Sequence, residues 1–68
     1  MMLKEYFTDF YGFTYSILHN TDGRALLTVR YPQGPLYLSK VYTTALGARI
    51  AMGRISEGTA RETGKEMI

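Results

Sequence analysis

Residues 38–55, LSKVYTTALGARIAMGRI, change their hydrophobic periodicity in the middle, and this change decides the predicted fold. The first part alternates apolar and polar residues, as a β-strand does. From Thr43 or Thr44 onward the apolar residues recur at helical spacing, and either threonine is a suitable helix cap. We therefore expect a strand that leads directly into a helix over 44–55. The apolar stripe of this helix consists of Ala45, Ala48, Met52 and Ile55.

The same stretch contains Gly47 and Gly53, so a phosphate-binding loop has to be considered. A P-loop requires a glycine-rich run that ends in Lys-Ser or Lys-Thr between a strand and a helix, and this stretch has none. The dinucleotide fingerprint G-x-G-x-x-G is also absent. We interpret both glycines as positions where the helix lies close to a sheet.

Upstream of the helix, the sequence predicts a three-stranded meander over 11–42. Residues 11–19, 24–31 and 36–42 each alternate between two faces, which is typical of strands with one buried face. The segments NTDG and PQGP separate them and are typical of tight turns. We therefore expect the three strands to pair in antiparallel order.

The flanking segments are expected to add no strands. Four apolar residues within 3–10 fall at the spacing of one helical stripe, which predicts a short helix there. Residues 56–68 are polar, and we expect a tail or a short helix. The predicted fold is a single α+β domain over 1–68: a three-stranded antiparallel β-meander packed against one C-terminal helix at 44–55, with a short N-terminal helix.

The predicted core combines the inward face of the meander with the stripe of the helix. A chain of 68 residues buries only about 60% of its unfolded surface, so this core leaves a small margin of stability. Its members are Phe13, Tyr15, Ile17, Leu27, Val29, Leu38, Ala48, Met52 and Ile55.

Composition restricts the classes of function. The chain has no cysteine and one histidine, which excludes disulfides, thiolate zinc sites and multi-histidine metal sites. No apolar run approaches the roughly 20 residues of a membrane span, and the segment MMLKEYF lacks the apolar region of a signal peptide. We therefore expect a cytoplasmic protein with no membrane segment and no cofactor. The formal net charge of +2 is compatible with a polyanionic partner.

No set of side chains typical of catalysis converges in the predicted fold. The single histidine, His19, ends a strand beside a turn, where a lone catalytic base is unusual. The six acidic residues fall on the polar side of 3–10, in a turn or in the tail. We therefore expect a binding protein rather than an enzyme.

The outward face of the predicted meander carries arginines, hydroxyls and a tyrosine. Arginines and hydroxyls contact phosphates, arginine also reads base edges, and tyrosine stacks on bases. We therefore predict a nucleic-acid-binding face centred on Arg24, Arg30 and Tyr37. Secondary contacts are expected from Thr14, Ser16, Thr28 and Ser39. Flanking phosphate contacts are expected from Lys40, Arg49 and Arg54.

Residues 12–55 run in the order strand FTYSILH, turn NTDGR, strand ALLTVRY, turn PQGP, strand LYLSKVY and helix TTALGARIAMGRI. This order resembles the small arm-type DNA-binding domains at the amino terminus of tyrosine-family phage and transposon integrases, which are related in shape to plant AP2 domains. In that family three strands lean on one helix and the sheet enters the DNA major groove. The resemblance implies a stand-alone accessory or regulatory protein that binds DNA.

An alternative is a protein-binding module. A chain of this size also resembles small phage gene products that bind and inhibit a host protein. The six tyrosines favour this alternative, because tyrosine is enriched at interface hot spots. Contact would be made by an open sheet edge, or by Tyr6, Phe10, Tyr37 and Tyr42. The sequence leaves open whether two copies form a homodimer.

Overall fold

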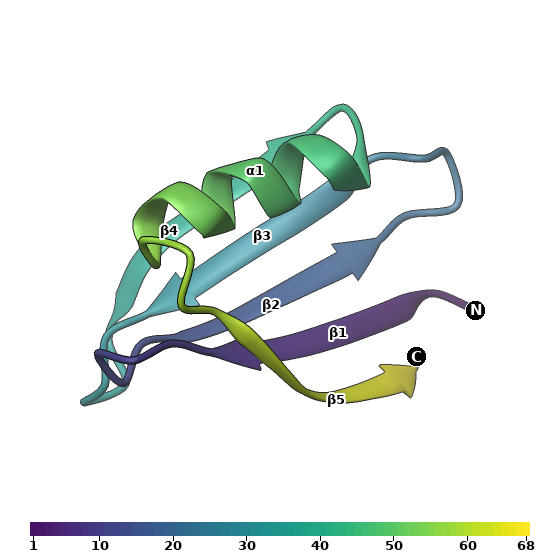
Figure 1. The fold of residues 1–68 in the computed structure, drawn as a ribbon. Helices are drawn as coiled ribbons and strands as arrows, with labels where there is room; N and C mark the ends of the chain where they lie inside the picture. The colour runs from purple at the N-terminus through teal and green to yellow at the C-terminus, as the bar shows by residue number, and fades with distance from the viewer.

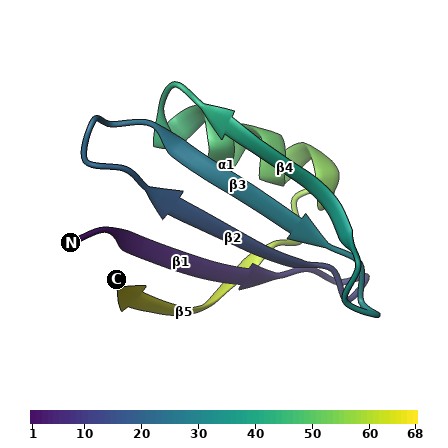
Figure 2. The same ribbon diagram turned by 180° about the vertical axis from the view of Figure 1, so that it is seen from behind.

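The computed structural model describes residues 1–68 as one antiparallel sheet of five strands with one helix on one face (Figure 1). The elements are β1 (Leu3–Thr8), β2 (Thr14–His19), β3 (Ala25–Arg30), β4 (Leu36–Tyr42), α1 (Ala45–Ile55) and β5 (Arg61–Met67). The strand order is β4-β3-β2-β1-β5, so the last strand pairs with the first. Figure 2 shows the sheet from the other side, where α1 lies behind it and no element covers the strands.

The prediction of three strands and an N-terminal helix is wrong. The segment 3–10, expected as a short helix, contains strand β1, and 56–68, expected as a tail or short helix, contains strand β5. Both pair with each other at one side of the meander, so the sheet has five strands. The broader expectation of an α+β fold with the helix against the sheet is confirmed.

The residues of β1 alternate in burial, as those of a strand do. Glu5 and Phe7 are buried on the side of α1, while Lys4 and Tyr6 line a hollow on the open side. The apolar residues of the segment fit only the period of 3.6, because the inward position 5 of the strand is the charged Glu5 and the outward position 6 is the aromatic Tyr6. The segment is a strand instead of a helix because its backbone is hydrogen-bonded to β2 on one edge and to β5 on the other.

The prediction of the helix is confirmed almost to the residue. Thr44 is the N-cap, and its hydroxyl accepts the backbone N–H of Gly47 at 3.1 Å. At the other end Glu57 and Gly58 adopt positive φ angles of 54° and 75°. The backbone N–H of Gly58 donates to the carbonyl of Gly53 at 2.8 Å, which closes the helix and directs the chain toward β5. This helix, 11 residues long, has neither the length nor the apolar composition needed to cross a membrane.

The core lies between α1 and the side of the sheet that it covers. Its buried apolar residues are Phe7, Tyr15, Ile17, Ala25, Leu27, Val29, Ala48 and Met52. Six of them belong to the predicted core, and the other predicted members, Phe13, Leu38 and Ile55, are partly buried against it. Phe7 is the contribution of β1, the strand that the sequence-based prediction missed.

Candidate nucleic-acid interface

A row of four hydroxyl-bearing residues crosses the open face. The register pairs Tyr6 with Ser16, Ser16 with Thr28, and Thr28 with Ser39, so the row extends from β1 to β4. Residues that pair directly across neighbouring strands point to the same side of a sheet. The row is therefore a continuous line of hydroxyl groups on the side opposite α1.

Each neighbouring row carries one cationic residue on β1 to β4, and β5 continues the two rows with Arg61, paired with Thr8, and Glu66, paired with Lys4. On one side the paired residues are Thr8, Thr14, Arg30 and Leu36. On the other side they are Lys4, Leu18, Leu26 and Val41. Lys4 and Arg30 therefore lie on opposite sides of the hydroxyl row, and no carboxylate is within ion-pair distance of either.

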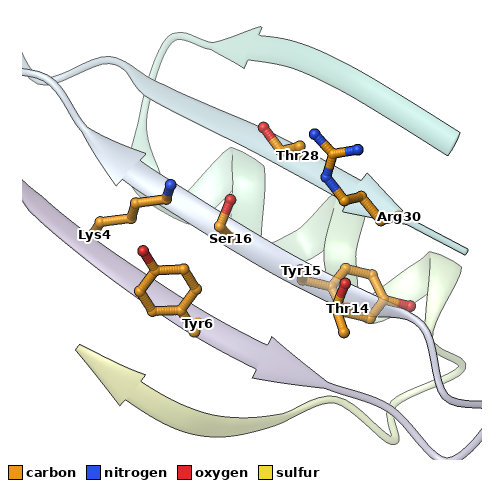
Figure 3. Close-up of a pocket in the computed structure, with 7 residues that line it drawn as sticks. All are labelled: Lys4, Tyr6, Thr14, Tyr15, Ser16, Thr28 and Arg30. Carbon is orange, nitrogen blue, oxygen red and sulfur yellow. The ribbon is translucent and has the colours of Figure 1, made fainter. Parts of the chain in front are cut away.

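The one pocket of the molecule is a shallow hollow of about 290 Å³ on this open face (Figure 3). It is lined by Lys4, Tyr6, Thr14, Tyr15, Ser16, Thr28 and Arg30. Figure 3 shows Lys4 and Arg30 at separate ends of the group, with Ser16 and Thr28 between them. A hollow with a cation at each end and hydroxyls along its floor has the chemistry of a site for an anionic, hydroxylated ligand.

The ring of Tyr6 is held in place within the hollow. Its hydroxyl donates a hydrogen bond to the carboxylate of Glu66 on β5. This bond raises the pKa of Tyr6 above its ordinary value of 10.0. The ammonium of Lys4 lies 5.2 Å from the centroid of the ring. The broad face of the ring is turned toward the open side in Figure 3.

Arg30 reaches beyond the end of β3. Its Nη1 donates to the carbonyl of Gly34 at 3.1 Å, in the turn between β3 and β4. This single bond orients the guanidinium and leaves its other donors free, because Arg30 is exposed and has no acidic partner. A guanidinium in this state is suited to contact a phosphate with two parallel hydrogen bonds.

Four of the predicted contact residues lie together in the hollow: Thr14, Ser16, Thr28 and Arg30. A fifth, Ser39, continues the hydroxyl row onto β4 without lining the hollow. The predicted outward phase of β2 and β3 thus agrees with the structure. The other lining residues are Lys4, Tyr6 and Tyr15. Tyr15 was predicted only for the core and Tyr6 only for the protein-binding alternative, and Lys4 was missed because its segment was expected as a helix. LKEYFT gave no clear signal of a strand, because its inward Glu5 is charged and its outward Tyr6 is aromatic.

Arg24, predicted at the centre of the face, lies in the turn before β3. Its Nε donates to Asp22 Oδ2 at 2.9 Å, and its backbone N–H donates to Asp22 Oδ1 at 3.0 Å. The backbone bond is the main reason that the pKa of Asp22 is held below its ordinary value. Arg24 is therefore engaged in the hairpin turn, outside the strand positions that form the open face.

Tyr37, also predicted at the centre, is displaced by a β-bulge. The pairing of β3 with β4 shifts between Val29 and Arg30, so Tyr37 has no direct partner in the register. Its ring packs edge-on against Phe13 and Tyr31, with centroid distances of 5.8 Å and 5.3 Å. These rings form an aromatic cluster at one end of the sheet, and Tyr37 does not line the hollow.

The three predicted flanking cations belong to the side of the helix. Lys40 pairs with the buried Leu27, so it projects from the face that α1 covers. Arg49 and Arg54 are part of α1 itself, and Arg49 is bound to Glu5. Lys40, Arg49 and Arg54 therefore do not lie beside the hollow on the open face, and their role as flanking phosphate contacts stays a prediction.

The four residues of the alternative, protein-binding prediction do not form one surface. Tyr6 lines the hollow on the open face, whereas Tyr42 is partly buried against the core on the other side. Phe10 is 78% exposed in the turn between β1 and β2. Tyr37 belongs to the aromatic cluster with Phe13 and Tyr31.

A buried carboxylate on the helix side was not expected from the sequence. Glu5 is only 4% exposed, and its Oε1 lies 2.6 Å from His19 Nε2 and 2.5 Å from Arg49 Nη2. Burial on its own raises the pKa of Glu5, but His19 and Arg49 outweigh it and hold the pKa below the ordinary value. The sequence analysis had placed Glu5 on a solvated helix face.

A second buried carboxylate, Asp9, organises the turn between β1 and β2. Its Oδ1 accepts the backbone N–H groups of Tyr11 and Phe13 at 2.9 Å and 3.0 Å, and its Oδ2 accepts the Tyr15 hydroxyl at 2.5 Å. All of its partners belong to this turn and to β2, so we assign Asp9 a structural role. No three His, Cys, Asp or Glu side chains come together as metal ligands.

Comparison with known proteins finds no matching family model, no matching curated protein and no matching solved structure. The functional proposal therefore rests on the geometry of the open face.

Proposed function

We propose that the protein binds nucleic acid on the open face of its sheet as a non-enzymatic accessory or regulatory protein. The observation that supports the proposal is the placement of Lys4 and Arg30, two cations that form no salt bridge, on opposite sides of the hydroxyl row. Arginine, lysine and hydroxyl side chains make most protein contacts to phosphates and sugars. The proposal includes the cytoplasmic location that the sequence predicts.

The small number of cations sets the expected strength of binding. Affinity for nucleic acid falls with salt by about 0.9 logarithmic units per phosphate contact for duplex DNA and by about 0.7 for single strands. Two contacts, at Lys4 and Arg30, give a slope of about −1.8 or −1.4 respectively. We therefore expect modest affinity that is strongest at low salt.

A salt titration by fluorescence anisotropy tests the proposal. Lys4→Gln and Arg30→Gln should each weaken binding, and each should reduce the salt slope by the share of one contact, about 0.7 to 0.9. Arg54→Gln is the matched control, because it removes the same charge from an exposed position on α1, on the other side of the sheet. Circular dichroism confirms that each variant is folded.

Two results would contradict the proposal. One is the absence of binding by the wild-type protein at low salt. The other is an equal loss of affinity in Arg54→Gln and Arg30→Gln, since that would indicate a general charge effect instead of a site on the open face.

A second candidate function is protein binding at the aromatic end of the sheet. Phe10 is 78% exposed, and Tyr11 and Tyr37 are about half exposed in the same region of turns and strand ends. Exposed aromatic side chains of this kind are the usual anchors of protein interfaces. A nuclease-treated pull-down should recover a stoichiometric partner with the wild type and lose it with Phe10→Ala. Recovery of the same partner by both proteins would exclude Phe10 as the anchor.

A further inference from the structure

We propose that the nucleic acid is single-stranded and that one base stacks on the ring of Tyr6. This inference rests on the proposed function and specifies its ligand. The occupant is an unpaired stretch of DNA or RNA, laid across the strands with its phosphates toward Lys4 and Arg30. Three features of the open face support it: its width, the position of its single aromatic ring and the row of hydroxyls.

The width of the sheet argues against insertion into a duplex. Neighbouring strands lie about 4.8 Å apart, so five strands span about 19 Å. The extents of the molecule along its three principal axes are 31, 20 and 19 Å. The major groove of B-DNA is about 12 Å wide. The three-stranded sheet predicted from the sequence would measure about 10 Å and would fit this groove. Strands β1 and β5 widen the sheet beyond it.

A broad open sheet instead suits a strand whose bases are unpaired. Single strands are bound by surfaces that combine a cationic track for the backbone with aromatic rings on which bases stack. The open face provides both within one hollow, since Lys4, Arg30 and Tyr6 all line it. It is not covered by any element of the chain, as Figure 2 shows.

Tyr6 is the only aromatic residue in the three rows of the open face. Its row lies between the row of Lys4 and the row of Arg30. A nucleic-acid backbone that crosses the strands diagonally beside a base on Tyr6 would therefore bring its phosphates toward both Lys4 and Arg30. The ring is already turned toward the open side in Figure 3, and its hydroxyl is bound to Glu66. This arrangement is preorganised for stacking.

The hydroxyls of Ser16 and Thr28 complete the site. They lie between the two cations and line the same hollow as Tyr6. Hydroxyl groups serve as both donors and acceptors, so they are able to contact phosphate oxygens and sugar hydroxyls alike. None of these groups recognises a particular base edge, so the site should tolerate most sequences.

The test compares four probes of about 12 nucleotides: oligo(dT), oligo(rU), a duplex of the same length and a single strand of abasic sites. At low salt the wild type should bind one of the two unmodified single strands more tightly than the duplex. The tighter of these two identifies the sugar, and either result supports the proposal. The abasic strand should bind about tenfold more weakly, because it keeps the phosphates and lacks the base.

Variants of Tyr6 isolate the stacked base. Tyr6→Leu should weaken binding of the preferred single strand about tenfold and leave binding of the abasic strand unchanged. Tyr6→Phe is the matched control, because it keeps the ring and loses only the bond to Glu66. Glu66→Gln removes a negative charge beside the ring and should tighten binding of every probe. If Tyr6→Leu does not fold, the weaker binding of the abasic strand by the wild type is the second readout of stacking.

The outcomes separate this inference from the proposed function. Tighter binding to the duplex, still dependent on Arg30, would overturn the single-stranded ligand and leave nucleic-acid binding standing. No binding to any probe at low salt would overturn both. Equal affinity of the wild type for the abasic strand and the normal strand would overturn stacking on Tyr6. Equal affinity of folded Tyr6→Leu and wild type would also overturn it.

Discussion

Arg49 Nη2 lies 2.5 Å from Glu5 Oε1, and this contact joins helix α1 to strand β1. The same guanidinium lies 5.7 Å from the centroid of the Phe7 ring, on the neighbouring inward position of the strand. His19 contacts Glu5 from β2. The strand that the sequence analysis misassigned is therefore fastened to the helix by a charged cluster as well as by apolar packing.

The first prediction concerns the pH dependence of stability. The pKa of Glu5 in the fold lies below its ordinary value of 4.5. Its stabilising contribution is therefore complete above pH 4.5 and is lost as the pH falls through the lower, folded pKa. Urea unfolding over a pH series should show this loss in the wild type and a flatter profile in Glu5→Gln. At neutral pH Glu5→Gln should be less stable by about 1–3 kcal/mol, discounted for the partly exposed partners.

Glu62→Gln is the control for this series, because Glu62 is exposed and its nearest cation, Lys65 Nζ, is 4.0 Å away. It should reproduce the wild-type profile closely. If Glu5→Gln and Glu62→Gln give the same profile, Glu5 does not make the predicted contribution.

The second prediction concerns the turn that Asp9 organises. Asp9→Ala leaves the buried Tyr15 hydroxyl and two backbone N–H groups without their acceptor. We expect a loss of more than about 2 kcal/mol in the free energy of unfolding. Tyr15→Phe removes only one of these bonds and should cost less. A double-mutant cycle in urea should give a clear coupling energy between the two sites, and simple additivity would contradict the bond.

The third prediction separates the two faces of β3. Leu27 is fully buried, and Leu27→Ala should destabilise the protein by about 2–5 kcal/mol. Its neighbour Leu26 lies in a row of the open face and is partly exposed, so Leu26→Ala should cost distinctly less. Chemical denaturation of both variants measures the difference. Equal losses would mean that the open face is covered in solution.

The fourth prediction concerns the glycines of the helix and the turns. A methyl group at Gly53 would meet no atom within 4 Å, so the helix does not approach the sheet closely there. Gly53→Ala should therefore stabilise the protein by about 0.5–1 kcal/mol. Gly12 has a φ of +89°, and its Cβ would lie 3.3 Å from Pro32. Gly12→Ala should destabilise the protein. Thermal unfolding should move the two melting temperatures in opposite directions, and a lower melting temperature for Gly53→Ala would contradict this view of the helix.

The parts of the fold that could be predicted are those with local signals. Strands β2, β3 and β4 are each bounded by a turn, and Gly23 and Gly34 in those turns have positive φ angles of 91° and 110°. Thr44 marked the start of α1 at the expected place. Alternation, turn glycines and a cap residue all act within a few residues, so a single sequence reveals them.

The two strands that were missed depend on contacts across the whole chain. β5 is rich in charge and contains Gly64, so its composition does not favour a strand. β5 is a strand because its backbone pairs with that of β1, with Leu3 opposite Met67. Pairing at such a separation leaves no local pattern in the sequence, and the five-stranded sheet could not be inferred without it.

Only part of the candidate site was predicted, because only some of its residues lie in strands with a local signal. The phase of β2 and β3 placed Thr14, Ser16, Thr28 and Arg30 correctly on one face. Arg24 and Tyr37 were misplaced by a turn interaction and a bulge, which a strict period of two does not describe. The lining residues of β1, Lys4 and Tyr6, were not placed on this face because β1 was not predicted as a strand.

The pairing of the first strand with the last has a consequence for synthesis on the ribosome. Strands β1 to β4 pair with their neighbours in sequence as they emerge, but β1 keeps one edge of unsatisfied backbone groups until residues 61–67 have left the exit tunnel. During that interval the nascent chain exposes an unpaired strand edge, and the pairing of β5 with β1 is the least local step in forming the sheet. The charged composition of the closing strand keeps it soluble while it waits for its partner.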